Sequence, residues 1–128
     1  MSLEVGIKGA AETLVVYENT AAAVGSGALE VFATPSMIAL MEKAALESVQ
    51  PYLEPGQGTV GVRLDVSHLA ATPLGMTVRA ECELTAIDRR MLTFNVRAYG
   101  GDELIGEGTH QRCIVYSERF MEKALAKA

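Results

Sequence analysis

The stretch TPSMIALMEKAALESVQ, from Thr34 to Gln50, decides the fold. It predicts one long α-helix, because a threonine can cap the first turn with its hydroxyl and the proline after it fits the first helical position. Pro51 predicts the end of the helix near Gln50. Around the helix, Lys43, Glu47 and Gln50 form one narrow polar stripe, and apolar side chains cover most of the rest. A helix with so little polar surface is predicted to be largely buried.

The residues after this helix change to the two-residue alternation of apolar and polar side chains that is typical of β-strands. In the first alternating stretch, Val62 and His68 are predicted to share the apolar face, while Thr59 lies on the opposite face. Turns rich in glycine, aspartate and arginine separate the stretches. The sequence therefore predicts four antiparallel strands, over Gly58–Leu69, Met76–Ile87, Leu92–Ala98 and Leu104–Tyr116.

Shorter elements precede the helix and follow the last strand. Strands are predicted over Ala10–Tyr17 and Ala28–Phe32, and the small residues of Glu18–Gly27 favour a mobile connection or a helical turn between them. Ser117–Ala128 is predicted to form a terminal helix with Ser117 as its cap. Only the long helix is large enough to cover the apolar face of the sheet, so we expect an α+β fold in which one helix is wrapped by a curled antiparallel sheet.

Composition narrows the classes of function. The chain has 128 residues, of which 49% are hydrophobic, and this predicts one folded domain over residues 1–128 and excludes wholesale disorder. A net charge of −5 argues against a nucleic-acid partner, and the lack of a long apolar run argues against a membrane helix. Cys82 and Cys113 lack metal-binding spacing, so we expect no metal site. Reduced cysteines and an N-terminus without a secretory pattern indicate the cytoplasm.

Two ionisable side chains interrupt the apolar patterns. Glu42 lies about 100° from the polar stripe of the helix and has no cation three or four residues away. It therefore needs a partner from another element, unless it lies at the edge of the buried face and reaches solvent or a structural arginine. His68 falls on the apolar face of its strand, where it is either a hydrogen-bonded core residue or a base that titrates near neutral pH.

Thr34 and Arg112 are the other two candidates. Thr34 is explained by capping alone, although a capping hydroxyl also lies beside exposed amides that could bind an oxyanion. Arg112, in the last predicted strand, is either a cation that reaches solvent or pairs with a carboxylate, or part of a site. Together the four residues supply a hydroxyl, a carboxylate, a base and a fixed cation, which are the groups that acyl transfer needs. Their spacing alone does not show that they meet.

The chain resembles the hotdog-fold thioesterases of the fluoroacetyl-CoA thioesterase-like family. The resemblance rests on VFATPSMIALMEKAA (Val31 to Ala45), YLEPGQGTVGVRLDVSHLAATPLGMTV (Tyr52 to Val78) and GEGTHQRCIV (Gly106 to Val115). It implies a hotdog fold and a dimer, possible dimers of dimers, and an acyl-CoA substrate at the subunit interface. Coenzyme A is then part of the substrate, and no separate cofactor is implied.

The resemblance also implies roles for five residues. Glu42 would attack the thioester carbonyl or activate water, and His68 would move protons and help to expel the thiol. Thr34 would orient or share a proton with that pair. The Gly61 amide would steady the carbonyl oxygen, and Arg112 would anchor charge near the acyl or pantetheine end.

One segment departs from the family pattern. The fluoroacetyl-CoA enzyme closes its pocket with aromatic lid residues, whereas Glu18–Ala28 contains none, and Gly25 and Ala28 are too small for such a lid. The sequence therefore predicts an acyl-CoA thioesterase for a small or medium acyl group, without fixing fluoroacetyl specificity. The alternatives are a hotdog module that binds acyl-CoA without hydrolysing it, and a hotdog enoyl-CoA hydratase or dehydratase.

Overall fold

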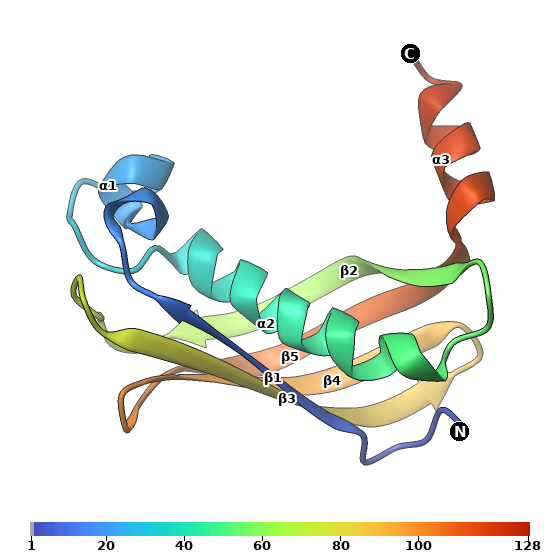
Figure 1. Ribbon diagram of the computed structural model, residues 1–128, viewed down its shortest axis with the longest axis horizontal. Coiled ribbons are helices and arrows are strands. Elements are labelled where there is room, and N and C mark those ends of the chain that lie inside the picture. The colour runs from blue at the N-terminus through green and yellow to red at the C-terminus, as the bar shows by residue number, and fades with distance from the viewer. Residues whose placement is uncertain (1) are drawn as a thin grey trace.

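In the computed structural model, which describes residues 2–128, a five-stranded antiparallel sheet curls around one long helix (Figure 1). The strands lie in the order β1-β3-β4-β5-β2, so that β1 and β2 are its edges. The strands are β1 (Lys8–Leu14), β2 (Gln57–His68), β3 (Thr77–Asp88), β4 (Met91–Gly100) and β5 (Glu103–Tyr116). The helices are η1 (Tyr17–Asn19), α1 (Ala21–Val24), α2 (Thr34–Val49), η2 (Gln50–Tyr52) and α3 (Ser117–Leu125), of which η1 and η2 are short 3₁₀ turns. The predicted α+β arrangement is confirmed.

The core lies between α2 and the concave face of the sheet. The helix packs mainly against β1 and β3, and its polar stripe of Lys43, Glu47 and Gln50 faces solvent as predicted. The predicted alternation holds along β4 and from Val78 to Leu84 of β3, where every second residue is buried. After Leu84 the pairing of β3 with β4 shifts register, and the last residues of β3 are exposed. The buried residues that define this core include Met37, Met41, Ala44, Val49, Val78, Ala80, Leu84, Leu92, Phe94, Val96 and Ala98.

The segment before α2 differs from the prediction. Ala28–Phe32 forms no strand, because Val31 and Phe32 make only isolated bridges, to Pro73 and Thr20. Of the two alternatives left open for the connection, the helical turns η1 and α1 are present. The first strand ends at Leu14 instead of Tyr17, since the Asn19 side chain accepts from the Val16 amide and donates to the Leu14 carbonyl.

Neither predicted capping side chain caps its helix. Thr34 is the first residue of α2 itself, and the cap position belongs to Ala33, which has no side-chain hydrogen bond to offer. Ser117 is likewise the first residue of α3, after Tyr116. The hydroxyl of Thr34 is therefore not occupied at the end of its own helix.

A bulge divides the edge strand β2. Pairing with β5 shifts between Gly61 and Arg63, so Val62 is an extra residue with no counterpart in the register. A bulge of one residue reverses the alternation that follows it. The prediction for Val62 and Thr59 is accordingly wrong, because Val62 is 51% exposed while Thr59 is buried on the side that faces α2.

The C-terminal helix α3 projects away from the rest of the molecule (Figure 1). None of its residues is buried, and Phe120, Met121 and Leu125 are exposed to solvent. Within residues 2–128, no helix is long and apolar enough to cross a membrane.

Candidate active site

The Thr34 and His68 side chains meet at the N-terminal end of α2. Oγ1 of Thr34 lies 2.8 Å from Nδ1 of His68, the last residue of β2. The hydroxyl can point toward the sheet because it is not engaged in capping. Two residues that the sequence analysis singled out separately, for different reasons, are thus hydrogen-bonded to each other.

The environment of His68 favours its neutral form. Burial lowers the pKa of His68 below the usual histidine value of 6.5, and the backbone of Ala70 offsets part of this effect. A neutral imidazole has one lone pair, so Nδ1 can accept the proton of the Thr34 hydroxyl if Nε2 carries the ring hydrogen. Nε2 is buried and has no hydrogen-bond partner among residues 2–128. The pair is therefore chemically able to move a proton between a hydroxyl and a base.

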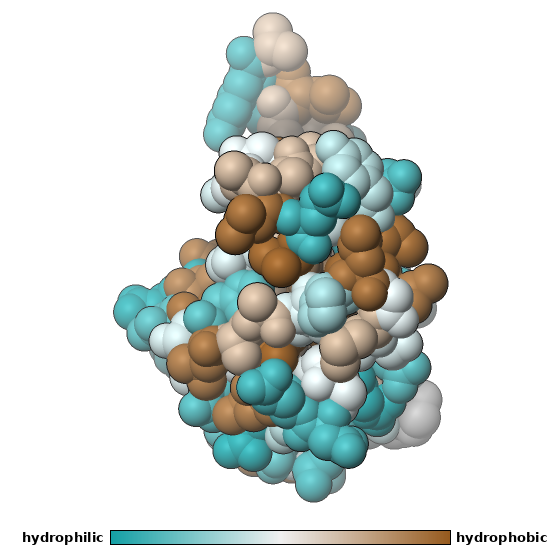
Figure 2. Space-filling view, turned by 90° about the vertical axis from the view of Figure 1, so that its left-hand side faces the viewer, coloured by the Kyte–Doolittle hydropathy of each residue, from teal (hydrophilic) through white to brown (hydrophobic). Residues whose placement is uncertain are grey.

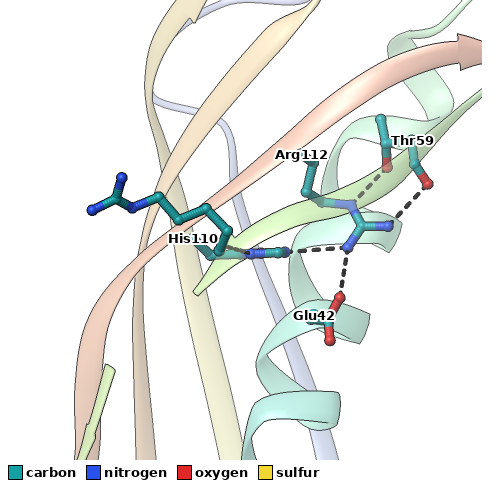
Figure 3. Close-up of polar contacts among 5 residues, drawn as sticks. Glu42, Thr59, His110 and Arg112 are labelled. Carbon is teal, nitrogen blue, oxygen red and sulfur yellow. Dashed lines mark hydrogen bonds and ion pairs between the residues drawn. The ribbon is translucent and has the colours of Figure 1, made fainter. Parts of the chain in front are cut away.

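Glu42 faces Arg112 of β5 across the interior. Oε2 of Glu42 lies 3.4 Å from Nη1 of Arg112 (Figure 3). The glutamate side chain is 37% exposed, whereas that of the arginine is only 6% exposed. Glu42 therefore has the partner from another element that the helix pattern required, and it still reaches solvent, as a residue at the edge of the buried face would.

Contacts on several sides hold Arg112 in place. Its Nε donates to Oγ1 of Thr59 at 2.7 Å, and Nη2 donates to the Thr59 carbonyl at 2.9 Å. Nη1 donates to Nε2 of His110 at 3.2 Å as well as to Glu42 (Figure 3). Burial lowers the pKa of Arg112 and Glu42 opposes that change, but a guanidinium stays protonated at any ordinary pH. The guanidinium is a fixed positive charge beside the Glu42 carboxylate.

Gly61 provides the space in which Glu42 lies. It is paired with Arg112 in the β2–β5 register. A Cβ at this position would collide with Oε2 of Glu42 and would lie 3.3 Å from Cε1 of His110. The absence of a side chain, rather than an unusual backbone angle, is what this position requires.

The five predicted site residues fall into two groups. Thr34 and His68 form one, and Glu42, Gly61 and Arg112 form the other. Within residues 2–128, no hydrogen bond or ion pair joins the groups. Eight residues of helix separate Thr34 from Glu42, a rise of about 12 Å. A single copy of the chain holds the two groups in separate places along α2 and β2.

Two residues of the second group, Thr59 and His110, were not predicted. Thr59 was missed because the bulge at Val62 reverses the face on which it lies. His110 could have been found, since it precedes Arg112 by two residues and must share its face of the strand. Its ring is fully buried.

The surface near Thr34 and His68 is formed by α1 and the loops around it. Figure 2 looks onto this end of the molecule and shows hydrophobic side chains interspersed with polar ones. The exposed apolar residues here include Val24, Leu29, Leu69 and Leu74. A concavity of about 610 Å³ lies elsewhere, beside Lys8, Arg79 and Arg97, and includes none of the five site residues. No three His, Cys, Asp or Glu side chains in the described range cluster as metal ligands would.

Comparison with known proteins supplies independent information. The family model described as fluoroacetyl-CoA-specific thioesterase matches residues 15–118. The fluoroacetyl-CoA thioesterase of Streptantibioticus cattleyicolor is 45% identical over 98 residues, which cover 77% of this chain and 70% of that protein.

Solved structures agree over nearly the whole chain. A variant of the fluoroacetyl-CoA thioesterase in complex with acetyl-CoA superposes with a TM-score of 0.91 at 36% identity, covering 98% of this chain and 99% of that one. A hot-dog-like protein from Thermanaerovibrio acidaminovorans gives a TM-score of 0.86 at 22% identity, with 96% and 91% coverage, and supports the fold alone. The predicted hotdog fold is confirmed.

Proposed function

Because this chain belongs to the fluoroacetyl-CoA-specific thioesterase family, we propose that it is an acyl-CoA thioesterase that uses Thr34, Glu42 and His68. The observation that carries the assignment of the site is the hydrogen bond between Thr34 and His68, which joins a hydroxyl to a base of lowered pKa. The accessible Glu42 carboxylate supplies the third group. In the reaction, water cleaves the bond between the acyl carbon and sulfur and gives the free acid and coenzyme A.

Each residue has a role that fits its surroundings. Glu42 is the group that attacks the carbonyl carbon or removes a proton from the attacking water, and the Arg112 guanidinium lies 3.4 Å from its Oε2 as a fixed partner. His68 takes up the proton released by the attacking water, directly or by way of Glu42 and solvent, and passes it to the departing thiolate, so that the imidazole is neutral again at the end of the reaction; its hydrogen bond to Thr34 orients the ring. The amide of Gly61, on the edge strand, is assigned to the carbonyl oxygen.

The separation of the two groups is explained by a homodimer that joins two β2 edges. β2 is a 12-residue edge strand, and a long unpaired edge favours pairing with another strand. A two-fold axis between Leu64 and Asp65 would place Gly61 opposite His68 of the partner subunit. Glu42 and Arg112 of one copy would then lie beside the Thr34–His68 pair of the other copy. In this arrangement the substrate lies at the interface and touches both subunits.

Mixed dimers test this arrangement directly. Glu42→Gln and His68→Ala are each expected to be inactive as homodimers. When the two variants are denatured and refolded together at equal amounts, half of the dimers carry one copy of each, and one of their two shared sites is intact. About one quarter of the wild-type activity should therefore return. No recovery, with mixed dimers shown to be present, would mean that each site lies within one chain.

The segment Glu18–Ala28, which corresponds to the lid of the fluoroacetyl-CoA enzyme, favours a substrate whose acyl group is larger than fluoroacetyl. Residues 23–30 are all exposed, and Gly25, with φ of 90°, ends the single turn of α1. No aromatic side chain lies between Glu18 and Ala28 to close over a small acyl group. We place the enzyme in the cytoplasm, where the thiols of Cys82 and Cys113 stay reduced.

An acyl-CoA panel tests the activity. The purified protein should release thiol from acetyl-, fluoroacetyl-, butyryl-, hexanoyl- and phenylacetyl-CoA at different rates, with the longer or aromatic chains preferred over fluoroacetyl. Binding of a non-hydrolysable CoA thioether without turnover of any of these thioesters would instead identify a binding module. Equal loss of activity in Glu42→Gln and in the surface variant Glu47→Gln would reject the site.

A further inference from the structure

His110 has no role in the reaction as described so far, yet it is one of the most enclosed polar residues of the chain. It lies on β5 with a relative exposure of 0%, two residues before Arg112 and on the same face. Its ring stacks on Phe94 of β4, with centroids 6.1 Å apart and an interplanar angle of 27°. A buried imidazole needs partners for both ring nitrogens, and it has them.

The two partners fix the position of the ring proton. Nδ1 of His110 lies 2.9 Å from the Arg63 carbonyl, which can only accept, so Nδ1 carries the hydrogen. Nε2 lies 3.2 Å from Nη1 of Arg112, which can only donate, so Nε2 carries a lone pair. His110 is therefore neutral and in a single tautomer. A hydrogen on Nε2 would point directly at a hydrogen of the guanidinium.

His110 and Thr59 hold the guanidinium from opposite sides. Thr59 accepts hydrogen bonds from Nε and Nη2 of Arg112, whereas Nη1 donates to His110 and Glu42 (Figure 3). The Arg63 carbonyl that orients His110 follows directly after the bulge at Val62. The bulge, the imidazole, the guanidinium and the Glu42 carboxylate thus form one continuous chain of contacts.

We propose that His110 is a positioning residue for thioester hydrolysis, whose neutral Nδ1–H tautomer aims Nη1 of Arg112 at Glu42. The inference rests on the proposed role of Glu42, and His110 itself touches no reacting atom. Without the Nε2 acceptor, Nη1 loses one of its two partners and the guanidinium can turn toward Thr59. The Glu42 carboxylate would then lose the contact that sets its direction.

The surroundings of His110 keep it neutral near pH 7. Burial lowers the pKa of His110 most, and the charge of Arg112 lowers it further, while the Arg63 carbonyl and Glu42 act in the opposite direction. The charged groups that face it are Arg112 from β5 and Glu42 from α2. From β2 the backbone carbonyl of Arg63 and the uncharged Gly61 face it, and from β4 the uncharged ring of Phe94. Protonation at acid pH would replace the acceptor with a donor and break the contact with Arg112.

Imidazole ¹⁵N NMR of the wild-type protein at pH 7.5 tests the tautomer without any substrate. The expected spectrum has a protonated Nδ1 and an unprotonated Nε2 for His110, assigned by comparison with His110→Gln. A protonated Nε2, or a doubly protonated ring at this pH, would overturn the proposal. This result does not depend on hydrolysis, so it stands apart from a failure of the proposed function, which would appear as no turnover of any thioester.

Two variants separate positioning from packing. His110→Phe keeps an aromatic ring that can stack on Phe94 but offers no acceptor, whereas His110→Gln keeps an acceptor that does not titrate. We expect His110→Phe to lower kcat about tenfold with KM within about twofold, because only the geometry of the reacting group changes. His110→Gln should restore kcat to within about threefold of wild type and remove one ionisation from the acid limb of the pH profile.

The outcomes are distinct. Unchanged kcat in His110→Phe would overturn the proposal, and so would an equal loss of kcat in folded His110→Phe and His110→Gln. If His110→Phe does not fold, the comparison of His110→Gln with wild type still decides, since the proposal requires near-normal kcat together with an altered acid limb. A His110→Gln profile that matches that of wild type would reject it.

Discussion

The Thr34 hydroxyl lies 2.8 Å from Nδ1 of His68, which connects the first turn of α2 to the last residue of β2. The two residues are 34 positions apart in the sequence, and each can be explained alone by a structural role: Thr34 as a helix cap and His68 as a hydrogen-bonded core residue. The structure contradicts the capping role of Thr34, because the hydroxyl makes no capping hydrogen bond at the start of α2.

The Thr34 contact predicts a separation between stability and activity. Thr34→Val keeps the branched shape but removes the hydroxyl, so the free energy of unfolding should change by less than about 0.5 kcal/mol. Hydrolysis of the best acyl-CoA substrate should nevertheless fall at least about tenfold, because His68 loses its partner. Thr34→Ser is the matched control and should retain activity. A large loss of stability of Thr34→Val on urea unfolding would instead indicate that the hydroxyl caps the helix.

Glu42 and Glu47 lie on the same helix and provide a direct comparison. Glu42→Gln keeps the size of the side chain and removes its charge, and we expect kcat to fall by about 10² to 10⁴. Glu47→Gln changes a solvent-exposed residue of the polar stripe and should leave kcat unchanged. Steady-state kinetics measure both. A Glu42→Gln enzyme with more than a tenth of wild-type kcat would contradict the assignment.

Gly61 should tolerate no side chain, for reasons of space. In Gly61→Ala the new Cβ would collide with Oε2 of Glu42, so the carboxylate must move and kcat should fall about tenfold or more. Gly58→Ala is the control on the same strand, where the new Cβ would meet only the Ser117 hydroxyl at 3.1 Å. Crystal structures of both variants would show whether Glu42 alone is displaced.

The buried arginine should matter more for stability than an exposed one. Arg112→Met keeps much of the volume of the side chain but leaves Thr59, His110 and Glu42 without their hydrogen-bond donor. It should lower the free energy of unfolding by about 2 kcal/mol. This is less than the loss expected for a fully buried ion pair, because Glu42 is partly solvated. Arg79→Met removes two surface ion pairs, with Glu12 and Glu81, and should change stability little. Urea unfolding compares the two, and equal losses would contradict the difference in burial.

Two histidines with lowered pKa predict a loss of stability in mild acid. His68 and His110 are neutral in the folded protein because burial disfavours their charged forms. The unfolded chain binds these protons more readily, so their contribution is complete above the usual value of 6.5 and is lost as the pH falls below it. The urea midpoint should therefore decrease between pH 7.5 and 5.5. The double variant His68→Gln, His110→Gln should show a smaller decrease over the same range, and an identical decrease would refute this explanation.

Much of the fold was determined by the sequence alone. The helical period of residues 34–50 and the alternation of apolar and polar residues in β3 and β4 indicate which side of each element is buried. They can do so because apolar side chains are buried wherever they occur along an element, so the pattern can be recognised without knowing what packs against it. Such patterns also marked Glu42 and His68 as exceptions. The resemblance to thioesterases rested on motifs that remain close together in the chain.

Only the tertiary structure decided which exceptions meet. Whether Thr34 caps a helix or binds His68 depends on where β2 ends relative to α2, and local spacing does not encode that distance. The single-residue bulge at Val62 puts Thr59 on the same inner face as Leu64 and Val66, because one extra residue reverses the alternation between the residues before it and those after it. Glu42 of α2 and His110 of β5 acquired a common partner in Arg112 only through the placement of β5 relative to α2. Apolar patterns determine which faces are buried, whereas contacts between polar groups depend on the relative placement of elements distant in sequence.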